Sequence, residues 1–225
     1  MDWDKIFATL EAWREELRRK AAGNTDEEPS VSALAAERRR DPWAVLVSTI
    51  LSLRTKDEVT RAASRALLGR APDPASLLAL PAEEVARLAY PAGFYRTKAA
   101  NLIKIAGILR DQYDGRVPAD MEKLLALPGV GRKTANLVLT EAFDLDGICV
   151  DVHVHRICNR AGWVKTLSPE QTEERLRQDL PKKYWKGINA LLVRYGQQIC
   201  RPVSPFCSRC VIRQWCEGRE VTRTR

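Results

Sequence analysis

Hydrophobic residues recur along most of this chain at intervals of three or four positions, the spacing that places them on one face of a helix. In the segment Trp3–Lys20, for example, Ile6, Leu10, Trp13 and Leu17 form such a face, and charged residues occupy the others. No segment alternates between hydrophobic and polar residues in the way that a half-buried strand does. The pattern therefore predicts an all-α protein built from many short helices.

Proline and capping residues divide this pattern into separate helices. Asp41 followed by Pro42 predicts an N-cap and the first position of a helix, and the segment Trp43–Leu53 is apolar nearly all round, which predicts a buried helix. Ser168, with Gln171 three positions later, predicts a capping box. Further helices are expected at Glu58–Leu68, Pro74–Leu80, Ala82–Ala89, Thr97–Gln112 and Tyr184–Ile199. The segment Ala22–Ser30 has the composition of a loop.

The composition is that of a self-sufficient globular protein. A chain of 225 residues has room for one large domain or two small ones that share a core. Hydrophobic residues make up 45% and charged residues 29%, which argues against disorder, and no apolar run approaches the length of a membrane span. The first residues lack the basic start and apolar core of an export signal. We therefore expect a cytoplasmic protein with no membrane contact.

A glycine-rich turn follows Pro128, which is expected to end one helix. Gly129-Val130-Gly131 allows a tight turn with positive backbone dihedrals. A second helix begins at once, so the amides of Val130, Gly131 and Arg132 should point outwards at its N-terminus and attract a phosphate. An ordinary corner between two helices is the alternative. The formal net charge of +8 and the pI near 9.3 also favour a polyanionic partner, and with this turn DNA is the best candidate.

Two residues beyond the turn carry candidate chemistry. Taken singly, Lys133 on a helix is usually a solvated charge, and Asp151 before a helix is usually an N-cap. Together, LPGVGRKTA at 127–135 and VDVH at 150–153 resemble the endonuclease III family of DNA glycosylases. The resemblance implies that the turn is a helix-hairpin-helix, that Lys133 is the nucleophile, and that Asp151 is the second catalytic residue.

Four cysteines lie close together near the C-terminus in the pattern C-x6-C-x2-C-x5-C: Cys200, Cys207, Cys210 and Cys216. In a protein that is not exported, such a group indicates a metal rather than disulfides. The spacing alone leaves both zinc and a [4Fe-4S] cluster open. The resemblance implies the [4Fe-4S] cluster, in a structural role. It also implies that the loop between the first two cysteines contacts DNA phosphates, although here that loop has one cation, Arg201.

Two further segments resemble family loops that enter DNA. Arg54 lies in a loop that reaches toward the lesion, where bacterial relatives commonly have glutamine. Phe94, in the segment GFYRTKA at 93–99, matches a residue that wedges into the duplex beside the extruded nucleotide. For an aromatic residue, packing in the core is the alternative.

The resemblance covers nearly the whole chain and implies two helical domains that flank a DNA-binding cleft. A six-helix domain is expected at residues 32–143, with the helix-hairpin-helix at about residues 124–140. Residues 1–31 and 144–225 are expected to form the cluster domain.

The implied function is that of a bifunctional DNA glycosylase and AP lyase of base excision repair. Such an enzyme removes oxidised pyrimidines from double-stranded DNA through a lysine Schiff base and nicks the strand by β-elimination. The expected partner is duplex DNA with a damaged base or an abasic site, bound by a monomer at the nucleoid. A monofunctional glycosylase is one alternative, which Lys133 disfavours because the adenine-excising branch lacks lysine there. A non-catalytic iron-sulfur protein that binds DNA is the other.

Overall fold

The computed structural model describes residues 1–20 and 29–225, and its elements there are all helices, which confirms the all-α prediction. The chain divides into two compact units, Pro29–Leu145 and Met1–Glu28 with Asp146–Arg225. The loop expected at Ala22–Ser30 lies outside the described residues except at its end, where Ser30 begins a helix. None of the described helices combines the length and the apolar character needed to cross a membrane.

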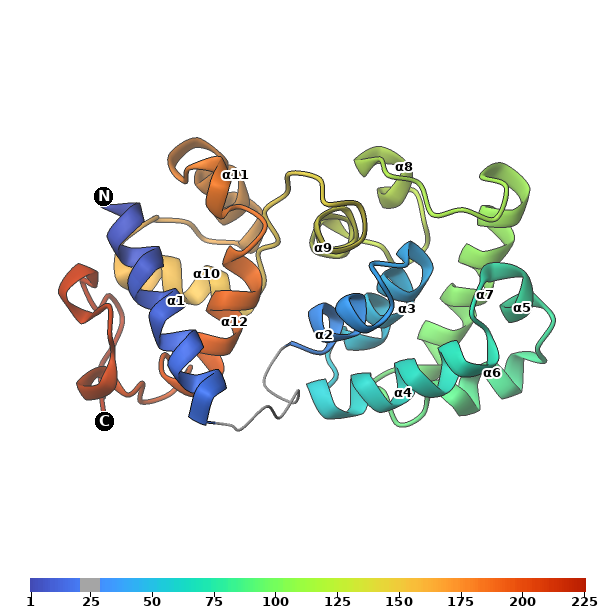
Figure 1. Cartoon of the computed structure of the whole chain (residues 1–225), viewed down its shortest axis with the longest axis horizontal. Helices are drawn as coiled ribbons and strands as arrows, with labels where there is room; N and C mark the ends of the chain where they lie inside the picture. The colour runs from blue at the N-terminus through green and yellow to red at the C-terminus, as the bar shows by residue number, and fades with distance from the viewer. Residues whose placement is uncertain (21–28) are drawn as a thin grey trace. The chain divides into compact units, whose positions relative to one another are not determined.

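The unit formed by Pro29–Leu145 is organised around α3 (Figure 1). Nine consecutive residues of α3, Trp43 to Leu51, are buried, which confirms the helix predicted to be apolar nearly all round. The helices α2, α4, α7 and α9 pack against it. The bounds of the unit's helices are α2 Ser30–Glu37, α3 Pro42–Ser52, α4 Asp57–Arg70, α5 Pro74–Leu78, α6 Ala82–Ala89, α7 Tyr95–Gln112, α8 Met121–Leu125 and α9 Arg132–Phe143.

The other unit joins the beginning of the chain to its last third. In Figure 1, α1 lies beside α12, and the two helices bury Ile6, Leu10, Leu192 and Tyr195 in one core. The bounds are α1 Trp3–Lys20, α10 Val152–Ala161, α11 Pro169–Asp179, the 3-10 helix η2 Lys182–Tyr184, α12 Ile188–Gln198, and the 3-10 helices η3 Cys207–Arg209 and η4 Arg213–Trp215.

The predicted helix starts depend on side-chain caps that the structure contains. Asp41 Oδ1 accepts a hydrogen bond of 3.1 Å from the Trp43 amide at the start of α3. Ser168 Oγ accepts one of 3.3 Å from the Gln171 amide at the start of α11. Each cap satisfies an N–H group that has no partner inside its helix. Both predicted N-termini are therefore confirmed.

The continuous helix predicted at Tyr184–Ile199 is wrong in its first turn. The segment instead begins in η2, and α12 starts only at Ile188. Gly187 immediately precedes α12, and glycine is a poor helix former. The Trp185 indole donates a hydrogen bond of 2.8 Å to the Leu180 carbonyl, which fixes the ring against the preceding turn. Local packing thus interrupts a hydrophobic pattern that is otherwise helical.

Candidate functional site

The turn between α8 and α9 requires glycine at one of its two glycine positions. Gly129 has a φ of +79°, and a Cβ atom there would lie 2.5 Å from Asn101 Nδ2. Gly131 has a φ of −99°, and a Cβ atom there would meet nothing within 4 Å. The expectation of positive dihedrals therefore holds for Gly129 and is wrong for Gly131. What glycine provides at the second position is open space in front of the α9 N-terminus.

The amides of the turn are used differently from one another. The Val130 N–H donates a hydrogen bond of 3.1 Å to the Leu127 carbonyl, so the expectation that this amide points outward is wrong. Its side chain is buried, which anchors the turn. The Gly131 N–H has no backbone acceptor among the described residues, and both Gly131 and Arg132 are exposed. The N-terminus of α9 therefore offers an N–H group, a positive helix dipole and a cationic side chain to an anion.

Lys133 is the second residue of α9 and is half-buried. Its position follows from the turn, because α9 begins immediately after Gly131. Lys133 therefore follows directly after Gly131 and Arg132, which form the candidate phosphate site. Its role as a nucleophile remains a prediction.

Asp151 caps α10, as the sequence predicted. Its Oδ1 atom accepts hydrogen bonds of 2.8 Å from the His153 amide and 3.0 Å from the Val154 amide, and the residue is 9% exposed. Two N–H donors and the positive end of the α10 dipole stabilise a negative charge on this carboxylate. Asp151 belongs to the unit that contains α10, whereas Lys133 belongs to the unit that contains α9.

Arg54 and Phe94 lie at the tips of two loops of the unit Pro29–Leu145. Both have left-handed backbones, with φ values of +53° and +56°, which is unusual for residues other than glycine. Phe94 is 66% exposed, so the alternative that it packs in the core is wrong. The Arg54 guanidinium carbon lies 5.8 Å from the centre of the Phe94 ring. The structure therefore brings these two predicted DNA-contacting side chains together on the surface.

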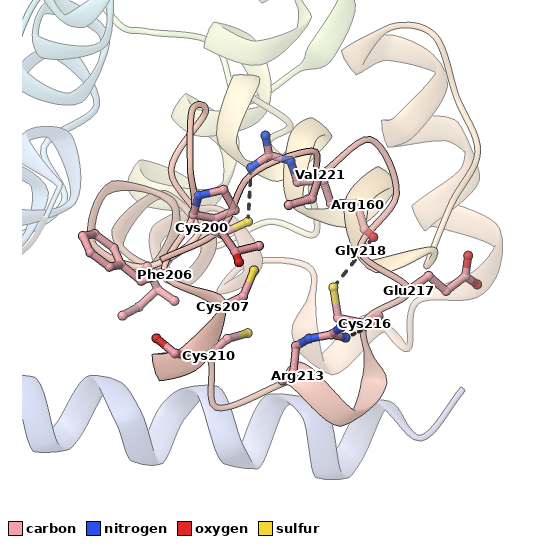
Figure 2. A pocket seen from close by; sticks show the side chains of 14 residues that line it. Arg160, Cys200, Phe206, Cys207, Cys210, Arg213, Cys216, Glu217, Gly218 and Val221 are labelled. Atoms are coloured by element: carbon pink, nitrogen blue, oxygen red, sulfur yellow. Dashed lines mark hydrogen bonds between the residues drawn. The ribbon is translucent and has the colours of Figure 1, made fainter.

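The four clustered cysteines line a cavity of about 380 Å³ (Figure 2). Arg160 donates a hydrogen bond of 3.7 Å to the Cys200 sulfur, and the Tyr195 hydroxyl donates one of 3.2 Å to the Cys210 sulfur. The cavity walls also include Val221 and Thr224, from the segment that follows the last cysteine. The cavity is thus built from the cysteine loop, α10 and the C-terminal segment.

The four thiols line one cavity together. Within the described residues, no three His, Cys, Asp or Glu side chains converge closely enough to hold one metal ion. The four thiols instead surround the cavity, as ligands of a multi-atom cluster would. Burial, together with the neighbouring Cys210 and Cys200, raises the pKa of the Cys207 thiol. Ionised thiolates would therefore need positive charge bound among them.

Arg201 belongs to a group of three arginines around Phe206. The guanidinium carbons of Arg201, Arg209 and Arg225 lie 5.1, 5.5 and 5.3 Å from the centre of the Phe206 ring. The sequence identified Arg201, but nothing in its pattern linked Arg225 to this loop. The link comes from the backbone, since Arg225 accepts a hydrogen bond of 3.1 Å from the Ser208 amide.

Comparisons with known proteins identify the family and support the fold. Residues 47–182 match the HhH-GPD superfamily of base excision DNA repair proteins. The chain is 48% identical to endonuclease III of Thermotoga maritima, over 79% of this chain and 83% of that protein. It is 42% identical to endonuclease III homolog 2, chloroplastic, of Arabidopsis thaliana, over 92% of this chain but 58% of that protein. A solved structure of a trapped endonuclease III–DNA covalent intermediate matches with a TM-score of 0.75 at 34% identity, over 79% of this chain and 84% of that one.

Proposed function

Because the chain belongs to the endonuclease III family of base excision DNA repair proteins, we propose that it removes oxidised pyrimidines from duplex DNA and then nicks the strand through a lysine Schiff base. The family makes it a DNA glycosylase and AP lyase. The observation that carries the covalent mechanism is the position of Lys133, an amine in the first turn of the helix whose N-terminus is open to a phosphate.

The turn between α8 and α9 would hold the strand next to the lesion. Gly131 leaves room for a phosphate to approach the helix N-terminus, and Arg132 adds a charge there. Contacts of this kind fix the register of the protein on DNA without reading its sequence. They also make binding sensitive to salt, because each neutralised phosphate releases counterions.

Access to the sugar requires that the damaged nucleotide leave the duplex. Extrusion costs a few kcal/mol, and less for a base that is poorly stacked or mispaired. Arg54 and Phe94 would occupy the space that the nucleotide leaves. Their exposure and mutual contact support this role.

The proposed reaction begins when the neutral amine of Lys133 attacks C1′ of the extruded nucleotide. A lysine with an ordinary pKa near 10.4 is neutral only about once in a few thousand molecules at pH 7, so a base must help. Asp151 would take the ammonium proton and stabilise positive charge on the sugar as the bond from C1′ to the base breaks. Its two amide donors fix the orientation of the carboxylate.

The sugar ring would then open as the bond between C1′ and O4′ breaks and O4′ takes a proton, which leaves the sugar attached to Lys133 as a Schiff base. Loss of a proton from C2′ allows the 3′ phosphate to leave, which nicks the strand by β-elimination. Water hydrolyses the Schiff base and releases Lys133. One site would therefore perform both base removal and strand cleavage.

Cys200, Cys207, Cys210 and Cys216 would hold a [4Fe-4S] cluster in the cavity that they line. When bound, such a cluster would cross-link this loop at four points and would supply no electron to the glycosidic reaction. Arg201, stacked on Phe206 at the rim of this loop, would contact a DNA phosphate. We also propose that the protein acts as a monomer, at the nucleoid where its DNA substrate lies.

The test uses a duplex with a single abasic site. The full chain should nick this strand, and borohydride should trap a covalent complex by reducing the Schiff base. The Lys133→Gln variant should form no complex, while Lys123→Gln, on the exposed side of α8, should behave like the unchanged protein. Binding without nicking would support the non-catalytic alternative. On a second duplex that carries an oxidised pyrimidine, base removal without a trapped complex would support the monofunctional one.

A further inference from the structure

Lys98 is a lysine whose ammonium group lies inside the protein. The residue is 6% exposed, and its Nζ atom donates hydrogen bonds of 2.8 Å to the Leu51 carbonyl, 2.5 Å to the Leu53 carbonyl and 2.9 Å to Thr55 Oγ1. These acceptors match the three protons of an ammonium group. Burial lowers the pKa of Lys98 to about 8, so the group still carries its charge at neutral pH.

The three acceptors belong to the end of α3 and the loop that carries Arg54. The last carbonyls of a helix have no partner within it, and the negative end of the helix dipole attracts a cation. Lys98, which projects from α7, therefore closes the C-terminus of α3. In doing so it fixes both neighbours of Arg54, namely Leu53 and Thr55.

The loop that carries Phe94 is tied to the same point. The Gly93 amide donates a hydrogen bond of 3.0 Å to Thr55 Oγ1, the atom that also accepts from Lys98. A Cβ atom on Gly93 would lie 2.6 Å from the Arg54 carbonyl oxygen, so only glycine allows the two loops to lie this close. The Lys98 amide also donates a bond of 3.0 Å to the Phe94 carbonyl.

Arg54 and Phe94 are the two residues that this network surrounds. Both adopt left-handed backbones, which persist in residues other than glycine only where the surroundings fix them. Both side chains nevertheless point to solvent and contact each other. A buried charge that holds two strained, exposed residues in place is typical of a functional arrangement rather than of a core.

We propose that Lys98 is a positioning residue that holds Arg54 and Phe94 side by side as a single wedge, which the enzyme needs on duplex DNA but not on single-stranded DNA. The inference rests on the proposed function, because it concerns the entry of these two residues into the duplex. In a duplex the wedge fills the space left by the extruded nucleotide. A single strand leaves no such space, so an abasic sugar there can reach Lys133 without the wedge.

If Lys98 only stabilised the fold, its removal would give a different pattern of activity loss. If the residue served only the stability of the unit, its removal would reduce activity on both forms of DNA in proportion to the loss of folded protein. A positioning residue produces a selective loss on the duplex in protein that remains folded. It also acts through Phe94, so its removal has little further effect once Phe94 is absent.

The experiment compares kcat/KM for nicking at an abasic site in duplex and single-stranded DNA of the same sequence. Lys98→Met removes the ammonium group and keeps the apolar stem, while Lys104→Met makes the same change at an exposed position of α7. We expect Lys98→Met to lose on the order of tenfold or more on the duplex and less than about twofold on the single strand. Lys104→Met should match the unchanged protein on both.

The Phe94→Ala variant completes the test. We expect Phe94→Ala and the double variant with Lys98→Met to show similar losses on the duplex. Equal losses on both DNA forms, no loss on the duplex, or independent effects of the two substitutions would overturn the inference. If the unchanged protein nicks neither form, the proposed function itself is wrong, so the two failures are distinguishable.

Gly93→Ala provides a second route if Lys98→Met does not fold, as judged by circular dichroism. The added methyl group must displace the Arg54 carbonyl, while the Lys98 side chain keeps its ammonium group. We expect the same selective loss on the duplex, because the two tips move apart. A folded Gly93→Ala variant with full duplex activity would show that the close contact of the loops is not needed.

Discussion

Two regions of this protein bring several polar groups close together, and they satisfy these groups differently. Around Lys98, the chain itself supplies every partner, since three oxygens accept from the ammonium group. Around the clustered cysteines, four thiols line a cavity of about 380 Å³ that the chain does not fill. The first region is completed by its own sequence, whereas we propose that a bound cluster completes the second.

The contrast indicates how the two units depend on a cofactor. The unit Pro29–Leu145 has α3 buried at its centre, and we expect this apolar core to fold without a bound group. In the cysteine segment, the described regular structure is limited to the short 3-10 helices η3 and η4. Stability should therefore respond to iron in one unit and not in the other.

The largest expected effect is the loss of the cysteine segment when the cluster is prevented from binding. Structural metal sites of known type contribute on the order of 10 kcal/mol to folding. We expect Cys207→Ser to raise amide hydrogen exchange throughout residues 199–224 by at least about a hundredfold, while protection in α3 stays unchanged. Hydrogen exchange followed by mass spectrometry measures both regions in one sample.

The matched control for this substitution is Cys149→Ala. Cys149 is buried in the same unit but does not line the cavity. It should reduce stability modestly and leave the iron content unchanged. Cys207→Ser could instead reduce protection equally in α3 and in the cysteine segment. That result would contradict the proposal that the two regions differ in their dependence on iron.

A smaller effect should appear in the pH dependence of stability around Lys98. Burial lowers its pKa from 10.5 to about 8 in the folded protein. Between these two values the unfolded chain binds more protons than the folded one, so the free energy of unfolding rises with pH. The neutral amine therefore contributes to the free energy of unfolding at high pH, and this contribution is lost as the pH falls through about 8.

This dependence is measured as a difference between proteins. The free energy of unfolding of the unchanged protein, minus that of Lys98→Met, should rise by about 1 to 3 kcal/mol between pH 8 and pH 10.5. The free energy of unfolding of the unchanged protein, minus that of Lys104→Met, should not change with pH. A flat difference for Lys98 as well would show that its ammonium group is not desolvated.

The smallest expected effect separates the two regions as DNA-binding surfaces. Arg201 would act on a phosphate through its charge, whereas Phe94 would act through its shape. Arg201→Ala should weaken binding to an abasic duplex a few-fold and lower the slope of log affinity against log salt by about 0.9. Phe94→Ala should weaken binding without changing that slope. Identical salt slopes for the two variants would remove this distinction.

Much of the helical architecture could be predicted because it depends on local signals. Asp41, Ser168 and Asp151 each cap a helix at the place that the sequence indicated. The helix Ala82–Ala89 was predicted with its observed bounds. The helix Ser30–Glu37 was missed, because the residues before it read as a loop and its own pattern is weakly amphipathic.

The arrangement around Lys98 could not be predicted, because it depends on tertiary contacts. A lysine on a helix is usually solvated, and nothing near it in the sequence shows that α3 ends beside it. Left-handed backbones at Arg54 and Phe94 run against local preference and follow from the close approach at Gly93. The family resemblance identified both residues in the sequence, but it did not indicate that Lys98 and Gly93 fix the loops that carry them.

The cysteine cavity shows the same limit. The spacing of the four cysteines predicted a common site, but not that residues beyond Cys216 would line it. The segment folds back through backbone bonds, with the Glu217 amide donating to the Ala161 carbonyl at 3.2 Å and the Arg219 amide to the Arg160 carbonyl at 3.0 Å. Such contacts join distant segments and leave no pattern in either one.

The central claim is that Lys133 forms the covalent bond to the sugar. The most direct test is to trap the complex with borohydride on an abasic duplex, digest the protein, and locate the modified peptide by mass spectrometry. The account predicts a single adduct at Lys133, lost in Lys133→Gln and retained in Lys98→Met. An adduct on a different residue, or nicking with no adduct at all, would contradict it.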